Sequence, residues 1–214
     1  MLCERIGHGG ASRLERANTI ASFDAALAVG VDVIEFDVRA WRGGLVLAHT
    51  LLHAQSGRRL PLDAALSHLA SPQFDEVGLH LDLEHTGIER AVLDGLNASG
   101  LLPRTLLCSQ VPAVLDRLRV LDPEAKVGIS VGGALARASR RWRDWRREVL
   151  SGLTERRFDA VMAQHRIIDR RLVGEVEERG GRLYAWTVNE RAAIDSLRAL
   201  GVHGITSGDP RLFV

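Results

Sequence analysis

Short apolar runs alternate with amphipathic stretches along the whole chain, and this alternation restricts the fold more than any other feature of the sequence. Each apolar run is short and rich in strand-forming residues, and each amphipathic stretch has the length of about three helical turns. We predict strands at Glu4–Gly7, Val31–Asp37, Gly78–Glu84, Thr105–Ser109, Lys126–Ser130, Ala160–Ala163, Arg182–Thr187 and Gly204–Thr206. Strands that alternate with helices form parallel sheets, and eight of them suggest a closed (β/α)8 barrel.

The predicted helices fill the spaces between these strands. They lie at Ile20–Val29, Asp63–Leu69, Glu89–Ser99, Ala113–Leu121, Ala134–Leu153, Asp169–Arg179 and Glu190–Leu200. No linker rich in proline, glycine or serine interrupts the pattern, so we expect one domain over residues 1–214. The chain is short for this barrel, which typically has ~250 residues.

Composition excludes several classes of protein. The formal net charge is +1, which argues against a protein that binds nucleic acid or another polyanion. No apolar run is long enough for a membrane span, and the first predicted strand begins too early to leave room for a signal peptide. Cys3 and Cys108 lie far apart in the sequence, so we expect a reduced, cytoplasmic protein of unknown oligomeric state.

Polar residues capable of chemistry follow several of the predicted strands. His8 ends the first apolar run, Glu35 and Asp37 end the second, and His49 ends the next. Residues two apart in a strand point to the same face, so the two carboxylates lie together. Such acids repel each other unless a cation lies between them, and carboxylate oxygens suit Mg²⁺ or Ca²⁺. The histidines can exchange protons near neutral pH.

The third predicted strand adds another acid to this group. Leu79, Leu81 and Leu83 alternate along it with polar residues that include Asp82 and Glu84. We expect the leucines to face the helices and the polar side chains to face the barrel interior, where buried charges need partners. Active sites of this fold lie at the carboxyl ends of the strands. Ser109, His165 and Trp186 also lie at such ends and are candidate pocket residues.

These motifs resemble those of the glycerophosphodiester phosphodiesterase family, within the phospholipase C-like phosphodiesterase superfamily. The family's motifs are a histidine after the first strand, Asn-Thr at a helix start, Glu-x-Asp, a second histidine, a third metal-ligand strand, Trp-Thr-Val-Asn and a closing Gly-Val-x-Gly-Ile segment. Here they correspond to Ile6–Ser12, Asn18-Thr19, Ile34–Asp37, His49, Leu81–Glu84, Tyr184–Asn189, Gly201–Ser207 and Asp209-Pro210. The match runs in the right order along nearly the whole chain.

The resemblance implies a metal-dependent phosphoric diester hydrolase, one that cleaves small-molecule glycerophosphodiesters to glycerol 3-phosphate and an alcohol. It implies catalytic roles for two histidines, a divalent cation (Mg²⁺ or Ca²⁺) on three carboxylates, and a tryptophan wall of the substrate pocket. The corresponding residues are His8 and His49, then Glu35, Asp37 and Glu84, and finally Trp186. It also implies that this chain lacks a longer insertion that the family often carries after the second strand, between His49 and Asp63.

Three departures from the family pattern concern charge. The family's arginine after the first histidine is Gly9, its glutamate before Asn-Thr is Ala17, and its lysine after the third carboxylate is Thr86. The missing arginine and lysine are associated in the family with neutralising the substrate phosphate, and fixed cations stabilise a phosphodiester transition state. Candidate replacements near strand ends are Arg13, Arg39 and Arg166.

Two alternatives to the glycerophosphodiesterase hypothesis stay open. One is a related phosphodiesterase that acts on lysophospholipids or another head group, although the loops at the barrel top look short and polar for an acyl-binding surface. The other is a non-catalytic barrel that binds a phosphorylated metabolite, which the substitutions at Gly9 and Thr86 favour.

Overall fold

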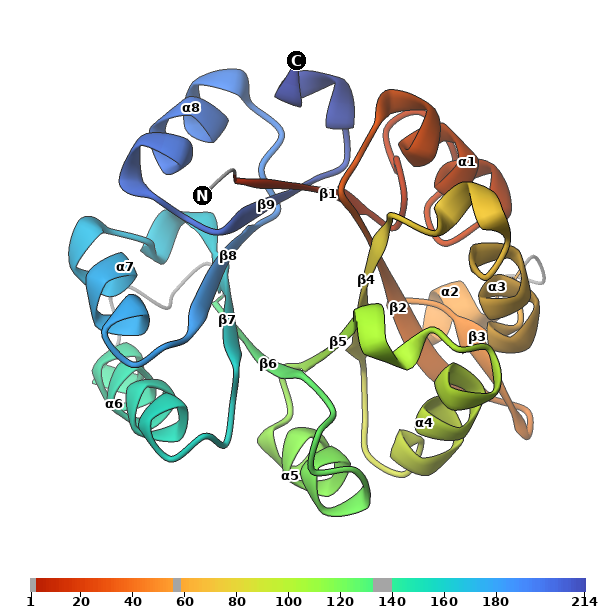
Figure 1. Cartoon of the computed structure of the whole chain (residues 1–214), viewed down its shortest axis with the longest axis horizontal. Helices are drawn as coiled ribbons and strands as arrows, with labels where there is room; N and C mark the ends of the chain where they lie inside the picture. The colour runs from red at the N-terminus through yellow and green to blue at the C-terminus, as the bar shows by residue number, and fades with distance from the viewer. Residues whose placement is uncertain (1–2, 56–58, 133–139) are drawn as a thin grey trace.

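A closed barrel of parallel strands forms the centre of the computed structural model (Figure 1), which describes residues 3–55, 59–132 and 140–214. Eight parallel strands pair in the order β1-β9-β8-β7-β6-β5-β4-β2, and a further pairing of β1 with β2 closes the ring. The strands are β1 Glu4–His8, β2 Val33–Trp41, β4 Gly78–Leu83, β5 Thr105–Ser109, β6 Val127–Val131, β7 Ala160–Gln164, β8 Arg182–Trp186 and β9 Gly204–Ser207. The predicted (β/α)8 barrel is confirmed.

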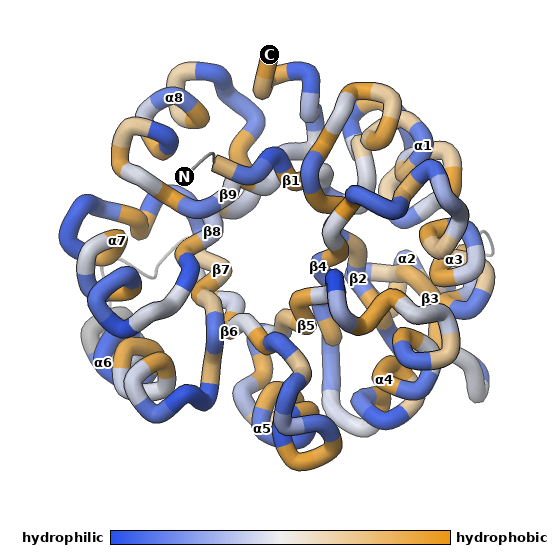
Figure 2. Tube along the Cα trace, viewed as in Figure 1, coloured by the Kyte–Doolittle hydropathy of each residue, from blue (hydrophilic) through white to orange (hydrophobic). Residues whose placement is uncertain are grey.

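Helices surround the barrel, and hydrophobic and hydrophilic residues alternate along them (Figure 2), as expected for helices with one face on a sheet. They are α1 Ile20–Val29, α2 Leu51–Gln55, α3 Leu62–Leu69, α4 Glu89–Ala98, α5 Pro112–Leu121, α6 Arg140–Thr154, α7 Arg170–Glu177 and α8 Arg191–Leu200. Short 3₁₀ turns lie at Pro72–Phe74, Leu102–Arg104, His165–Ile167 and Pro210–Phe213. Residues 134–139 of one predicted helix lie outside the described residues. None of the helices in the described ranges has the length and apolar character that a membrane crossing needs.

Local sequence signals explain where α1 begins and ends, and α1 follows the segment that carries His8. The Thr19 side chain accepts a hydrogen bond from the backbone N–H of Ser22 and so caps the first turn. Gly30 adopts a left-handed conformation with φ 82° and ends the helix, as glycine does at this position. Phe23 and Ala26 on its inner face are fully buried against the barrel.

Strand β4 shows how the barrel divides its side chains between two environments. Leu79, Leu81 and Leu83 are buried in the large core between sheet and helices. His80 and Asp82, which alternate with them, line a cavity inside the barrel. The predicted orientation of this strand is therefore confirmed, and it places acidic groups in the interior. The remaining barrel interior is a small apolar cluster that includes Ile6, Met162 and Tyr184.

The second strand is longer than its predicted range, Val31–Asp37. Strand β2 continues to Trp41 and turns back into β3 (Gly44–Leu47), which pairs with it antiparallel. Arg42 and Gly43 form the two-residue turn with φ of 48° and 82°, the conformation that tight hairpins require. This hairpin returns the chain to the barrel mouth, where His49 follows it. In the described residues, the connection to β4 includes β3, α2, α3 and the 3₁₀ turn at Pro72–Phe74.

Candidate active site

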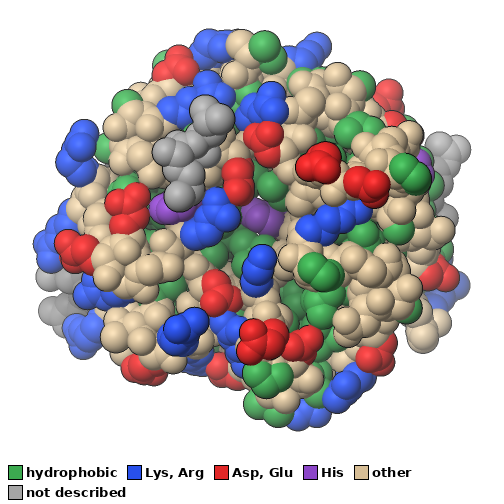
Figure 3. Space-filling view, viewed as in Figure 1, with side chains coloured by type: hydrophobic (Ala, Val, Ile, Leu, Met, Phe, Trp, Pro, Cys, Tyr) green, Lys and Arg blue, Asp and Glu red, His purple; other side chains and the backbone are tan. Residues whose placement is uncertain are grey.

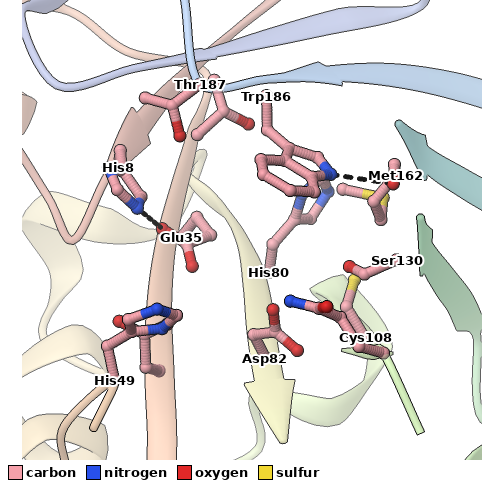
Figure 4. A pocket seen from close by; sticks show the side chains of 13 residues that line it. His8, Glu35, His49, His80, Asp82, Cys108, Ser130, Met162, Trp186 and Thr187 are labelled. Carbon is pink, nitrogen blue, oxygen red and sulfur yellow. Dashed lines mark hydrogen bonds and ion pairs between the residues drawn. The ribbon is translucent and has the colours of Figure 1, made fainter. Parts of the chain in front are cut away.

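A cavity opens at the carboxyl ends of the strands and brings the predicted histidines and acids together. Its volume is about 170 Å³, and we call it the main cavity. Figure 4 shows His8, Glu35, His49 and Asp82 around it, on β1, β2, the segment after β3, and β4. The lining comprises His8, Glu35, Asp37, His49, His80, Asp82, Cys108, Gln110, Ser130, Met162, Trp186, Thr187 and Thr206.

One imidazole nitrogen joins two of the predicted metal ligands. Nδ1 of His49 lies 2.7 Å from Oε1 of Glu84 and 3.1 Å from Oδ1 of Asp37. Ligand atoms of these three residues all lie within 4.8 Å of one another, so they could hold a metal ion. The two carboxylate side chains are largely buried, at 7% exposed for Asp37 and 16% for Glu84.

Neighbouring side chains fix these two carboxylates. Asn18 donates from Nδ2 to Oδ2 of Asp37 at 2.8 Å, and its Oδ1 accepts from the Asp37 backbone at 3.2 Å. Asn18 has φ 61°, a left-handed conformation that asparagine tolerates better than most residues. Arg39 donates to Oε2 of Glu84 at 3.1 Å and to the His49 carbonyl at 3.0 Å. These contacts preorganise the group before any ligand binds.

Glu35 lies on the other side of Asp37 and contacts the first histidine. Its Oε2 accepts from the backbone N–H of Gly9 at 2.9 Å and lies 4.0 Å from Nε2 of His8. Gly9 has φ 56°, which turns its N–H toward the carboxylate. The residue that follows His8 therefore takes part in the site through its backbone.

The buried acids repel one another. Burial, and then the nearby Asp37, raises the pKa of Glu35 well above its usual value. Burial, followed by Asp37 and Glu84, raises the pKa of Asp82 to about 7. Burial also acts to raise the pKa of Asp37, but hydrogen bonds from His49 and Asn18 outweigh it, so this pKa is lowered. Acidic groups are thus crowded at the barrel mouth, and the carboxyl groups of Glu35 and Asp82 hold their protons more strongly than free ones do.

The two histidines differ in their proton affinity. Burial, together with the positive charge of His49, lowers the pKa of His8, although Asp37 opposes this. Hydrogen bonds with Asp37 and then Glu84 raise the pKa of His49 to about 11. At neutral pH, His8 is therefore neutral and can accept a proton, whereas His49 is protonated and can donate one.

The donor set fits a hard divalent cation. The predicted ligands Glu35, Asp37 and Glu84 all offer carboxylate oxygens, which Mg²⁺ and Ca²⁺ prefer, but the group whose ligand atoms converge contains His49 in place of Glu35. Burial and the neighbouring Asp37 raise the pKa of Glu35, and a cation beside it would favour its ionised form. Glu84, however, already contacts two cationic groups, Arg39 and His49.

The wall opposite the histidines is apolar. The Trp186 indole N–H donates to the Met162 carbonyl at 2.8 Å, which fixes the ring against the cavity (Figure 4). Met162 and Cys108 continue this wall. A ligand in the main cavity would therefore contact acidic groups on one side and an aromatic surface on the other.

Three other predicted pocket residues do not line the main cavity. Ser109 is fully buried, and its hydroxyl donates to the Leu83 carbonyl at 2.6 Å. Nδ1 of His165 lies 3.4 Å from the Trp186 carbonyl, behind the wall. The backbone N–H of Arg13 donates to the Gly208 carbonyl at 2.8 Å. Substrate contacts for these residues stay predictions.

A second cavity, which we call the side cavity, adjoins the main one. Its volume is about 250 Å³, and it shares His8, Asp37 and His49 with the main cavity. Its remaining lining comprises Gly9, Arg16, Ala17, Asn18, Leu47, Ala48 and His53. His8 and His49 therefore lie on the border between the two cavities.

Sequence reasoning missed several contributors to the site. Asp82 is predicted to lie inside the barrel but without a role, and no role is predicted for His80 and His53, although each lines a cavity. A polar residue facing the interior of a barrel strand is the signal that identifies His80 and Asp82. Asn18 was noted only as part of a motif, and its hydrogen bond to Asp37 depends on the fold.

Comparison with known proteins identifies the family of this chain. The model of the glycerophosphoryl diester phosphodiesterase family matches residues 8–50 and 71–212. YhdW of Bacillus subtilis (strain 168) is 25% identical over 244 residues, covering 98% of this chain and 96% of that protein. These matches include the segments that carry His8, Asp37 and Glu84.

Solved structures of low sequence identity share the fold. A glycerophosphodiester phosphodiesterase from Agrobacterium tumefaciens str. C58 superposes with a TM-score of 0.77 at 18% identity, covering 99% of both chains. An Oleispira antarctica phosphodiesterase, solved with the product sn-glycerol-3-phosphate, gives 0.77 at 20% identity, covering 98% of this chain and 94% of that one.

The barrel, with histidines and carboxylates gathered at one mouth, defines a phosphoric diester hydrolase. The family match covers most of the chain, and the protein belongs to the glycerophosphoryl diester phosphodiesterase family.

Proposed function

We propose that this protein hydrolyses glycerophosphodiesters to glycerol 3-phosphate and an alcohol, with one divalent cation held by Glu35, Asp37 and Glu84. The observation that carries the proposal is the placement of His8 and His49 beside these acids at the border of two cavities. A phosphodiester needs a group on each side of the phosphorus, one to activate water and one to protonate the leaving oxygen.

We assign the two proton transfers from the surroundings of the histidines. His8 accepts a proton from the attacking water as the new P–O bond forms, because its lowered pKa keeps it neutral. His49 gives a proton to the departing alkoxide as the other P–O bond breaks. Its Nδ1 is held by two carboxylates, which leaves Nε2 as the nitrogen that faces the substrate. A second proton exchange with solvent restores both histidines.

The bound cation, Mg²⁺ or Ca²⁺, supplies Lewis-acid polarisation of a phosphoryl oxygen. Trp186 forms the wall against which we place the substrate, since its ring is fixed by its own hydrogen bond. Both cysteines are free, which fits a reducing compartment such as the cytoplasm.

Direct assay of the purified protein tests this function. A panel of glycerophosphodiesters is incubated with Mg²⁺, with Ca²⁺ or with a chelator, and released glycerol 3-phosphate is measured. We expect release with one of the metals and its loss on chelation. Metal-independent release would contradict the cation site. Binding of the diesters without cleavage would favour the non-catalytic barrel, and cleavage of lysophospholipids alone would favour that substrate class.

A further inference from the structure

The side cavity has a specific relation to the reacting pair. His8, Asp37 and His49 line both cavities, so a phosphate placed between the two histidines would touch each compartment. A phosphodiester carries two alcohol arms that leave the phosphorus in different directions. One cavity is therefore available to each alcohol arm.

Two small residues leave the side cavity open. Gly9 and Ala17 both line it, and neither has a side chain larger than a methyl group. They also pack together, because a Cβ atom built on Gly9 would lie 2.9 Å from Cβ of Ala17. Gly9 has φ 56°, which disfavours any larger residue. The space is thus a consequence of this particular sequence.

The side cavity is rich in basic groups. Arg16 and His53 line it in addition to the shared histidines. The one acid in its lining is Asp37, and both of its carboxylate oxygens already accept hydrogen bonds or ion pairs, from Asn18 and His49. The charge of His49 is matched by Asp37 and Glu84, so Arg16 is the cationic side chain of this lining that we expect an anionic ligand to contact.

The main cavity has the opposite character. Asp82 lines it, and its carboxyl group can accept a hydrogen bond from an alcohol hydroxyl. Trp186 offers an apolar wall on the far side. These features suit the uncharged, hydroxyl-bearing glycerol arm and disfavour a second anion.

On this basis we propose that the side cavity is a subsite for a negatively charged alcohol arm, with Arg16 as its specificity-determining residue. The proposal rests on the proposed function and narrows it: the preferred diesters carry a second phosphate or a similar anion beyond the scissile bond. Diesters with a cationic arm, such as choline, are poor substrates because Arg16 repels them.

Three glycerophosphodiesters of graded arm charge test the subsite. They are glycerophosphoglycerol phosphate with an anionic arm, glycerophosphoglycerol with a neutral arm and glycerophosphocholine with a cationic arm. We expect kcat/KM to fall in that order. Arg16→Gln should lower kcat/KM about tenfold for the anionic arm and change the neutral arm by less than about twofold. Arg117→Gln, an exposed arginine on α5 that lines neither cavity, is the matched control.

A second pair of variants fills the same part of the side cavity and differs only in charge. Ala17→Glu should suppress cleavage of the anionic arm more strongly than Ala17→Gln does, and the choline diester should be cleaved better by the Glu variant than by the Gln variant, since both side chains fill the same space. Equal losses with Glu and Gln would show that bulk alone matters and would overturn the proposal.

The remaining outcomes separate the subsite from the activity itself. Equal loss on all three diesters in Arg16→Gln would place Arg16 at the reacting phosphate and overturn the subsite. No change in any would also overturn it. If no diester is cleaved at all, the proposed function fails, and calorimetric binding of the same three diesters still decides whether Arg16 selects the charged arm.

Discussion

Charged residues have different surroundings at the two ends of this barrel. At the amino ends of the strands, acids and arginines are paired: Arg5 with Asp32 at 2.8 Å and Arg182 with Glu4 at 2.6 Å. Figure 3 looks onto this end and shows basic and acidic side chains interspersed across the face. At the carboxyl ends, four acids on β2, on β4 and directly after β4 lie near Arg39 and two histidines. These acids are Glu35, Asp37, Asp82 and Glu84.

This difference shows which end is built for stability and which for chemistry. Hydrogen bonds from Arg5 lower the pKa of Asp32, so its charge favours folding. Burial raises the pKa of Asp82 to about 7, so its charge opposes folding. An acidic side chain that lies at a cavity and whose charge lowers stability is available to bind a ligand.

The largest expected effect comes from removing the proton carriers. His8→Ala and His49→Ala should each lower kcat by ~10²–10⁴-fold, the usual contribution of an acid or base. The His8 variant should lose the acidic limb of the pH–rate profile and the His49 variant the basic limb, because their pKa values are shifted down and up. Circular dichroism checks folding. A variant with wild-type kcat removes its histidine from the mechanism.

The next effect concerns the cost of the crowded acids. In the presence of a chelator, Asp82→Asn should be more stable than wild type at pH 8, by at most about 4 kcal/mol. Asp82 has a raised pKa, so its contribution is favourable below pH ~4 and is lost as the pH rises through about 7. The gain should therefore vanish near pH 4. Urea unfolding across this range measures it, and a pH-independent difference would contradict the electrostatic explanation.

Adding a cation should recover stability at the same end. Binding to the folded state alone stabilises it by about 2.7 kcal/mol when the ion is present at 100 times its Kd. We expect Tm to rise with Mg²⁺ or Ca²⁺ and the rise to disappear when Glu35, Asp37 and Glu84 are all replaced by Ala. Sodium chloride at equal ionic strength is the control for general screening. An equal rise in Tm in the triple variant would show that the ion binds at another site.

The smallest effect is expected at the paired end. Asp32→Asn removes an exposed ion pair with Arg5 and should cost about 1 kcal/mol or less, with activity unchanged. Asp32 has a lowered pKa, so its contribution is present above pH ~4 and is lost as the pH falls below that. The loss in the variant should therefore be seen at pH 7 and disappear near pH 2. A large loss of activity would contradict the assignment of the amino ends of the strands to stability alone.

The sequence predicted the barrel because strand and helix periodicities are local. It predicted the gathering of His8, Glu35 and His49 because the fold places strand ends together. It did not predict the β2–β3 hairpin, although the adjacent glycines Gly43 and Gly44 are a turn signal. The sequence also did not predict which arginine lines the site, because that depends on the direction of the side chain.

The arginines illustrate this limit. Arg39 was one of three candidates and is found tied to Glu84, while Arg13 and Arg166 line neither cavity. Arg16, three residues after Arg13 in the same loop, lines the side cavity. Loop residues lack the periodicity that tells inner from outer faces, so only the folded chain separates these two.

The pairing of β1 with β9 has a consequence for synthesis. Glu4 and Ile6 pair with Gly204 and Thr206, so the strand that carries His8 is made first and meets one of its neighbours last. At 5–20 residues per second, roughly 10–40 s separate the two events on a ribosome. During that interval one edge of β1 has no partner from β9. The barrel and the active-site end that depends on it are thus completed late. Chaperones and competing β-strands therefore have most opportunity to bind at the unpaired edge of β1.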